Sequence, residues 1–281
     1  MTTRRATPAA LVSPPDPATL HAMLTRLKLT AIRDQLDTLL AEAARRELTL
    51  VETVAYLCER EIARKDARRI DMALGLARFP MIRELSGYDF SAQPGVDKQQ
   101  IRELATGRFI ANGESVLLLG PPGVGKTHLS VGLGRAAITA GYTVLFTSAT
   151  TLIAQLVKAH TQGQLDEKLL HFAKPKLLII DELGYLPIEP DAAHVLFQLV
   201  SRRYERGSIL LTSNRAVSEW GAVFGDPVVA TAILDRLLHH SHVLTIRGES
   251  YRLKDKRRAG LLTAHKQLDQ SSATSPQGVN S

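Results

Sequence analysis

The fold is decided by one stretch, Ser115-Val-Leu-Leu-Leu-Gly-Pro-Pro-Gly-Val-Gly-Lys-Thr127. Its first residues are apolar and predict a buried strand, and the residues from Gly120 to Thr127 fit the pattern G-x-x-x-x-G-K-[ST]. The glycines allow successive backbone N–H groups to turn toward phosphate groups, and the helix that follows adds its positive N-terminal end. The stretch therefore predicts a phosphate-binding loop between a strand and a helix.

The last residues of this loop have distinct expected roles. Lys126 reaches the β- and γ-phosphates of a nucleotide, and the Thr127 hydroxyl binds Mg²⁺. The alternative, a plain glycine-rich turn, does not account for the flanking strand and helix patterns. The expected cofactors are therefore ATP or ADP with Mg²⁺, and the nucleotide-binding candidates are Gly120, Pro121, Pro122, Gly123, Val124, Gly125, Lys126, Thr127 and His128.

A second strand ends in two acidic residues, in the run Leu177-Leu-Ile-Ile-Asp181-Glu182. In a parallel sheet the carboxyl ends of the strands line the ligand crevice, so Asp181 should lie beside the loop. A carboxylate there holds Mg²⁺, usually through water. Glu182 is then placed to act as general base toward water. The alternative is that both residues begin a solvated turn before Gly184.

Three further polar residues are candidates. Asn214 ends the strand-like run Ile209–Asn214, where its amide can orient water or contact a phosphate. Arg236 and Arg252 flank the last strand-like run, and a guanidinium can neutralise the charge that develops on a transferred phosphoryl group. For each arginine a surface salt bridge is an equally good interpretation from the residues alone.

Apolar runs alternate with helical patterns through the C-terminal two thirds of the chain. The strand candidates are 116–119, 143–147, 177–180, 209–212 and 243–246. The helical stretches lie near 126–140, 150–172, 190–206 and 228–240. Short apolar strands separated by helices predict an α/β fold with a parallel five-stranded sheet that is covered on both faces.

The N-terminal part has a different pattern. Apolar residues recur at helical spacing from Leu20 to Leu40, and Thr49-Leu-Val-Glu52 matches a capping box at the start of a second helix. That helix has a basic face, formed by Arg60, Arg64, Lys65, Arg68 and Arg69. We therefore expect a disordered leader (1–16), a small all-helical domain (17–85), a linker (86–100), an α/β nucleotide-binding domain (101–262) and a disordered tail (263–281).

The composition favours some classes of binding partner and cellular location over others. The formal net charge of +7 favours a polyanionic partner, with nucleic acid as the first candidate. No apolar run approaches the ~20 residues that a membrane span needs. The single cysteine, Cys58, is expected to be buried in a helix, and together with the absence of a secretion signal it predicts a cytoplasmic protein. The neighbouring His239, His240 and His242 do not predict a zinc site.

Six runs together closely resemble the IstB family, ATPases encoded beside the IstA transposase in bacterial insertion sequences. They are Gly120–Thr127, Leu177–Pro187, Ser201-Arg-Arg-Tyr-Glu-Arg-Gly-Ser208, Leu211-Thr-Ser-Asn214, Leu234-Asp-Arg-Leu-Leu-His-His240 and Gly248-Glu-Ser-Tyr-Arg252. The family is related to the DnaC helicase loader within the AAA+ superfamily. The resemblance covers residues 17–260.

The resemblance implies an ATP-dependent regulator of transposition. Such proteins oligomerise on duplex target DNA, recruit an IstA-type transposase and are released when ATP is hydrolysed. By the same resemblance, Arg236 corresponds to an arginine that acts on the nucleotide of the neighbouring subunit, and Arg252 to a second sensor. The segments 150–160 and 164–172 resemble a DNA-facing insertion, with Lys158, His160 and Lys168 as candidates, and the helical N-terminal domain would help to clamp duplex DNA.

Two alternatives stay open. A DnaC-like replicative helicase loader would have the same fold and nucleotide site, and would differ in its DNA preference and its partner. A small-molecule kinase would need an acceptor pocket, which the sequence does not reveal. One departure from general AAA+ architecture is expected: too few residues follow the last strand to build a C-terminal helical lid, which makes the role of Arg252 less certain than that of Arg236.

Overall fold

The computed structural model describes residues 16–185, 187–248 and 250–251. The chain divides into two compact units, Met1–Ala73 and Leu74–Ser281. The sequence places this division at residue 85, whereas the structure places it within a long helix. The expected leader (except residue 16), the expected tail, Arg252 and the region of the expected missing lid lie outside the described residues.

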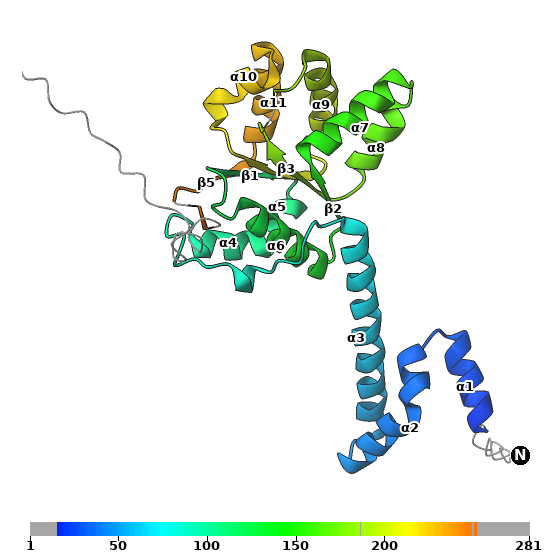
Figure 1. Ribbon diagram of the computed structural model, residues 1–281. Helices are drawn as coiled ribbons and strands as arrows, with labels where there is room; N and C mark the ends of the chain where they lie inside the picture. The colour runs from blue at the N-terminus through cyan, green and yellow to red at the C-terminus, as the bar shows by residue number, and fades with distance from the viewer. Residues whose placement is uncertain (1–15, 186, 249, 252–281) are drawn as a thin grey trace, which may run out of the picture. The chain divides into compact units, whose positions relative to one another are not determined.

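The described part of the first unit, residues 16–73, is helical and contains one more helix than the sequence predicts. Its helices are α1 (Pro17–Arg26), α2 (Thr30–Arg45) and α3 (Leu50–Ala77), which continues into the second unit (Figure 1). Lys28 has a left-handed φ of 56°, and the N–H of Leu29 donates to the carbonyl of Leu24 at 2.9 Å. This Schellman-type turn separates α1 from α2. Apolar spacing alone misses it because lysine, rather than glycine, occupies the left-handed position.

The start of α3 confirms the capping box. The backbone N–H of Thr49 donates to the Glu52 carboxylate at 2.8 Å, and the N–H of Glu52 donates to the Thr49 hydroxyl at 3.3 Å. The expectation for Cys58 is wrong. Its side chain is exposed because it lies on the face of α3 that carries the exposed Val54 and Ile62.

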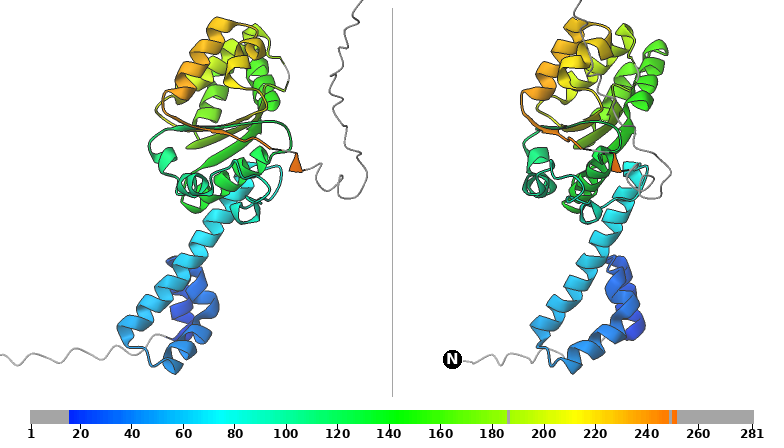
Figure 2. Two further views of the ribbon diagram at one scale, coloured as in Figure 1. Left: turned by 90° about the vertical axis from the view of Figure 1, so that its left-hand side faces the viewer. Right: turned by 60° about the vertical axis from the view of Figure 1, so that its left-hand side comes forward.

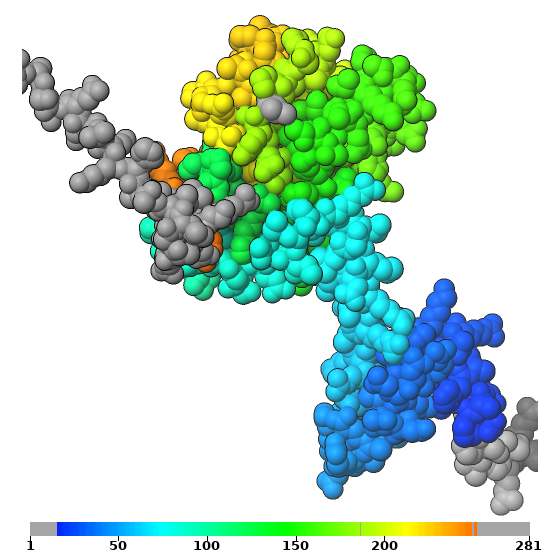
Figure 3. All heavy atoms as spheres, in the orientation of Figure 1, coloured from blue at the N-terminus to red at the C-terminus, as the bar shows by residue number. Residues whose placement is uncertain are grey.

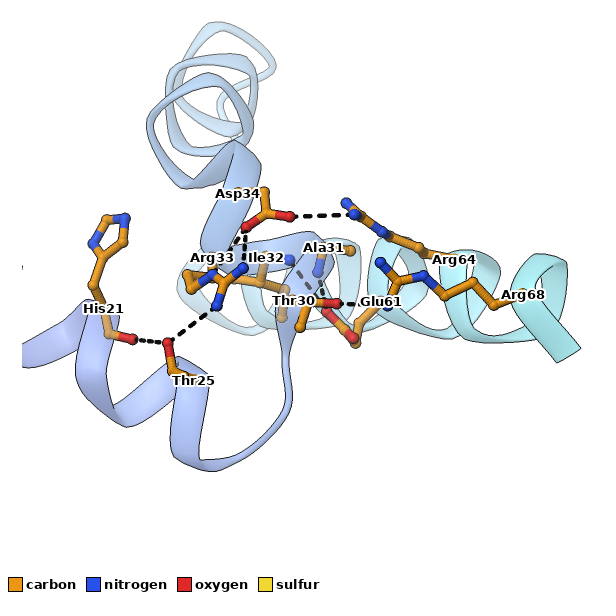
Figure 4. A network of polar contacts seen from close by, with 10 residues as sticks. All are labelled: His21, Thr25, Thr30, Ala31, Ile32, Arg33, Asp34, Glu61, Arg64 and Arg68. Atoms are coloured by element: carbon orange, nitrogen blue, oxygen red, sulfur yellow. Dashed lines mark hydrogen bonds and ion pairs between the residues drawn. The ribbon is translucent and has the colours of Figure 1, made fainter.

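A buried carboxylate joins α2 to α3. Glu61 of α3 is 3% exposed and accepts the N–H groups of Ala31 at 2.7 Å and Ile32 at 3.2 Å, in the first turn of α2 (Figure 4). Burial raises the pKa of this carboxyl, but the two backbone donors and Lys65 outweigh burial, so its pKa lies below the ordinary value. Glu61 therefore satisfies helix-end donors that would otherwise be left without partners.

The second unit is built on a parallel five-stranded sheet, which confirms the predicted fold class. The strand order is β2-β3-β4-β1-β5, and every neighbouring pair is parallel. The strands are β1 (Ser115–Leu119), β2 (Val144–Ser148), β3 (Leu177–Leu183), β4 (Ser208–Ser213) and β5 (Ser241–Thr245). All five coincide with predicted strands to within two residues at most ends, because short apolar runs between glycine- and proline-containing turns are a strong local signal.

Helices cover both faces of this sheet (Figures 1 and 2). One layer contains α7 (Ala149–Thr161), α8 (Leu165–Ala173), α9 (Pro190–Arg203), α10 (Trp220–Phe224) and α11 (Pro227–Leu238). The other contains α4 (Lys98–Ala105), α5 (Arg108–Ala111) and α6 (Lys126–Thr139). Two short 3₁₀ turns are η1 (Leu85–Gly87) and η2 (Val217–Glu219). The sequence predicts the long helices and misses α4, α5 and α10, which are short.

The sheet is the centre of the core. Residues Val116–Leu118 of β1 and Leu177–Ile179 of β3 have no exposed surface, as expected for strands that are covered on both faces. None of the helices in the described part of the chain combines the length and the apolar character that crossing a bilayer requires.

Arg203, at the end of α9, is 1% exposed and has no carboxylate partner among the described residues. Its guanidinium donates instead to five backbone carbonyls, at 2.7 to 3.2 Å, belonging to Phe172, Ala173, Pro175, Lys176 and Ser208. Burial lowers the pKa of Arg203 to about 10. One side chain thus holds the segment between α8 and β3 against the start of β4.

We predict that Arg203→Met lowers the free energy of unfolding by about 2–4 kcal/mol, because several buried carbonyls lose their donors. Arg202→Met is the matched control. The adjacent Arg202 forms an exposed ion pair with Asp166 at 2.8 Å, and its loss should cost less than about 1 kcal/mol. Urea unfolding followed by circular dichroism measures both, and equal losses would contradict this account of Arg203.

Candidate nucleotide-binding site

The phosphate-binding loop lies between β1 and α6, as predicted, and its shape requires glycine. Gly123 has a φ of 86°, and a Cβ there would lie 2.1 Å from the Ser250 hydroxyl. Gly125 has a φ of 95°, and a Cβ there would lie 2.7 Å from the ring of Tyr88. Gly125 is also the residue that precedes α6, and no described side chain caps that helix N-terminus. Its first N–H groups are therefore available to an anion.

Lys126 lies over this loop. Its ammonium group donates to the carbonyls of Gly120 at 2.6 Å and Pro121 at 2.9 Å. The amine is therefore held at the opening of the loop, where the sequence places it.

The structure brings Asp181 to Thr127, as the sequence predicts. Asp181 is 6% exposed and accepts hydrogen bonds from the Thr127 hydroxyl at 3.0 and 3.2 Å, and from the Thr212 hydroxyl at 2.6 Å. Thr212 is absent from the sequence-derived candidates, because a threonine within an apolar strand has no distinguishing signal. A buried carboxylate and a hydroxyl thus meet at the carboxyl ends of β3 and β4.

Glu182 occupies an unusual backbone position. The register between β3 and β4 shifts between Ile180 and Leu183, and Glu182 has a left-handed φ of 64°. Its N–H donates to the Thr212 hydroxyl at 2.9 Å. A bulge of this kind redirects a side chain, and backbone strain of this kind is concentrated at functional sites. Glu182 is exposed and lines the cleft beside the loop.

Asn214 follows β4 and lines the same cleft. Its side-chain oxygen is buried and has no hydrogen-bond partner among the described residues. Buried polar atoms are nearly always paired, so this oxygen is suited to bind a group that enters the cleft.

The cleft has a volume of about 400 Å³ and a second wall that the sequence analysis missed. This wall comes from 81–93, part of which was expected to be linker. Tyr88 is buried, its hydroxyl donates to the Val124 carbonyl at 3.1 Å, and burial raises its pKa to about 12. Its ring also lies edge-on to Phe90 and His128. Tyr88 and Phe90 are two aromatic residues in an otherwise polar stretch. They were the sequence signal that could have predicted packing of 86–100 against the loop.

These residues fit ATP and Mg²⁺. The glycine positions leave no room for a side chain, the N-terminus of α6 offers N–H groups, and Thr127 and Asp181 supply the oxygen ligands that Mg²⁺ prefers. The volume of the cleft is within the range of small-molecule sites.

Arg236 lies apart from this cleft, on α11. Its guanidinium carbon is 4.5 Å from the centroid of the Phe197 ring, and its Nη1 donates to the Ala232 carbonyl at 3.3 Å. Arg252 is outside the described residues.

The five residues of the predicted basic face of α3, which are candidates for DNA contact, each have a partner within the first unit. Arg64 pairs with Asp34 at 3.2 Å. The other contacts join Arg60 to Tyr56, Lys65 to Glu61, Arg68 to Thr30 and Arg69 to Asp66. The paired side chains of Arg64, Lys65 and Arg69 are still one third to one half exposed.

Lys158 and Lys168 lie together. Both line a groove between α7 and α8, with His171 and Glu167. These two helices form an outer surface of the second unit (green in Figure 3). His160 is exposed on α7 but does not line this groove.

The comparisons with a family model and with individual proteins agree on one family. Residues 22–259 match the model of the IstB-like ATP binding protein family. A protein of insertion sequence IS21 from Pseudomonas aeruginosa, named as ATP-binding, is 47% identical over 244 residues, which cover 87% of this chain and 92% of that protein. The corresponding protein of IS5376 from Geobacillus stearothermophilus is 45% identical over 251 residues, covering 89% and 98%.

A similar solved structure is that of DnaI, with a TM-score of 0.50 and 22% identity over 62% of this chain and 94% of DnaI. At this identity the likeness shows the fold alone, which is a parallel sheet covered by helices on both faces.

We predict that Thr212→Val weakens Mg²⁺-dependent ATP binding by about 10- to 100-fold, because Asp181 and the Glu182 backbone lose a shared partner and shift. Thr212→Ser, which keeps the hydroxyl, should restore most of the affinity. Thr147→Val is the control, since among the described residues the Thr147 hydroxyl bonds within β2, to the Ser148 carbonyl at 3.3 Å. An unchanged affinity in Thr212→Val, measured by titration calorimetry, would contradict the assigned role.

Proposed function

We propose a function from the premise that this chain belongs to the family of IstB-like ATP-binding proteins. It is an ATP-dependent, DNA-binding helper of transposition, and it acts in the cytoplasm. Copies that hold ATP assemble on duplex target DNA and recruit an IstA-type transposase. Hydrolysis of ATP releases them.

The observation that carries the enzymatic part is the cluster of Asp181, Glu182 and Thr212 beside Thr127. Mg²⁺ held by Thr127 and Asp181 would neutralise charge on the phosphates. Glu182 accepts a proton from the attacking water, and the Asn214 amide orients that water. Lys126 and the loop N–H groups bind the β- and γ-phosphates. Each role uses a side chain that lines the cleft or contacts one that does.

The second wall of the cleft is suited to the base of the nucleotide. Met81 and Tyr88, which line this wall, offer apolar surface. Since Tyr88 also bonds to the Val124 carbonyl, a base bound there would contact a residue that supports the phosphate-binding loop.

DNA binding is supported by charge. The chain has a net charge of +7, and its proposed contacts with duplex DNA are the groove cations Lys158 and Lys168 and the basic face of α3. The ion pairs of Arg64 with Asp34 and of Arg69 with Asp66 are partly exposed on both sides, so they are weak and can exchange a carboxylate for a phosphate. The insertion-sequence relatives favour a transposase as partner over a replicative helicase.

Self-assembly would complete the nucleotide site. Arg236 lies apart from the cleft of its own chain and is proposed to act on the nucleotide of a neighbouring copy. An arginine supplied in this way stabilises charge on the transferred phosphoryl group.

We predict that ATP raises the affinity of Glu182→Gln for duplex DNA by at least about 10-fold, since this variant binds ATP without hydrolysing it. Lys126→Ala, which lacks the phosphate contact, should show no such response. Fluorescence anisotropy with a labelled duplex measures both, and the affinity should fall steeply as salt rises, because phosphate contacts release counterions.

Two results would contradict the proposal. One is duplex affinity that does not respond to ATP in the Glu182→Gln variant. The other is a preference for single-stranded DNA together with capture of a hexameric helicase, which would instead support a DnaC-like loader.

A further inference from the structure

The described part of the chain places no carboxylate in an ion pair with Arg236. Some other arginines of the second unit pair with carboxylates, as Arg135 does with Glu84 at 3.3 Å and Arg215 with Glu219 at 3.1 Å. Among the described residues no carboxylate oxygen lies within 4 Å of the Arg236 guanidinium, whose polar contact is the Ala232 carbonyl at 3.3 Å. Arg236 is half-buried, so its position is restricted although no anion holds it.

What holds it is an aromatic ring. The guanidinium carbon lies 4.5 Å from the centroid of Phe197, well within the range of a cation–π contact. Phe197 is on α9. Its side chain is partly buried and packs against the apolar core between the sheet and this helical layer. Since α9 and α11 pack closely together, the ring has a fixed position relative to α11.

An aromatic ring and a carboxylate can both hold an arginine side chain, but they differ in how much of its positive charge remains available. A carboxylate cancels the positive charge and competes with any incoming anion. An aromatic face orients the planar guanidinium and limits its rotamers while leaving the net charge and the outward N–H groups available. The outer face of α11 around Arg236 is open, and it includes Val228, Thr231, Ala232 and Asp235.

We infer that Phe197 is a positioning residue for ATP hydrolysis: its ring holds the Arg236 guanidinium in place, uncompensated, to meet the nucleotide phosphates of a second copy of this chain. This inference rests on the proposed function, in which Arg236 acts between copies. Phe197 itself touches no nucleotide and acts only through Arg236.

The first test compares substitutions at Phe197 in the full chain with saturating ATP, Mg²⁺ and duplex DNA. Phe197→Leu keeps an apolar side chain but removes the ring, and it should lower kcat by roughly 3- to 10-fold with little change in the KM for ATP. Phe197→Tyr keeps the ring and should stay within about 2-fold of the wild-type kcat. Sedimentation confirms that each variant still assembles.

A second test separates positioning from a structural role. Arg236→Ala should lower kcat by about 10³-fold. In the Arg236→Ala background, Phe197→Leu should cause no further loss in single-turnover hydrolysis, because its effect passes through the guanidinium. Phe224→Leu is the matched control: the same change to a buried ring of the same core, packed against Trp220, should lower Tm without lowering kcat.

The outcomes are distinguishable. If Arg236→Ala hydrolyses ATP normally, the proposed shared site is wrong and the positioning role falls with it. If Arg236→Ala is impaired but Phe197→Leu is not, only this inference is overturned. A third result is that Phe197→Leu lowers the rate of ATP hydrolysis by the same factor with and without Arg236. That result would also overturn the inference, because the ring would then act through the core.

Discussion

The nucleotide site depends on one hydroxyl group. Thr212 of β4 donates to the Asp181 carboxylate at 2.6 Å and accepts the Glu182 N–H at 2.9 Å. The first bond fixes the carboxylate that also contacts Thr127, and the second stabilises the bulge in which Glu182 has a left-handed backbone. A regular strand would direct consecutive side chains to opposite faces of the sheet. Here the bulge lets Asp181 stay buried while Glu182 lines the cleft, so two adjacent carboxylates can have different chemical roles.

Local features of the fold and site could be predicted from sequence, and features that depend on distant contacts could not. The loop at Gly120–Thr127 and the five strands are local patterns, and the position of Asp181 follows from parallel topology. Thr212 and Tyr88 were missed because their importance comes from partners at Asp181 and Val124. Lys28 ends α1 in a conformation that favours glycine, and Cys58 lies on an outer helix face. Neither outcome can be read from residue type.

The same contacts suggest how nucleotide state is communicated beyond the loop. Tyr88 bonds to the Val124 carbonyl, and the N–H of Tyr251 donates to the Gly123 carbonyl at 3.0 Å. The loop is therefore hydrogen-bonded to a segment that precedes β1 and to a segment that follows β5. Apart from the loop, in the layer that contains α9 and α11, the Arg236 guanidinium lies against the Phe197 ring. A site divided between two copies would make ATP both the substrate and the link between neighbours, so that hydrolysis would weaken the assembly on DNA.

The central claim is that one copy supplies the cleft and another supplies Arg236. Mixing two variants that are each impaired tests it most directly. Arg236→Ala keeps Glu182, and Glu182→Gln keeps Arg236 and still binds ATP. With duplex DNA, Mg²⁺ and ATP, the account predicts that an equal mixture hydrolyses ATP well above the sum of the two separate rates, because mixed neighbours rebuild complete sites. A rate equal to that sum, in a mixture shown by sedimentation to co-assemble, would contradict it.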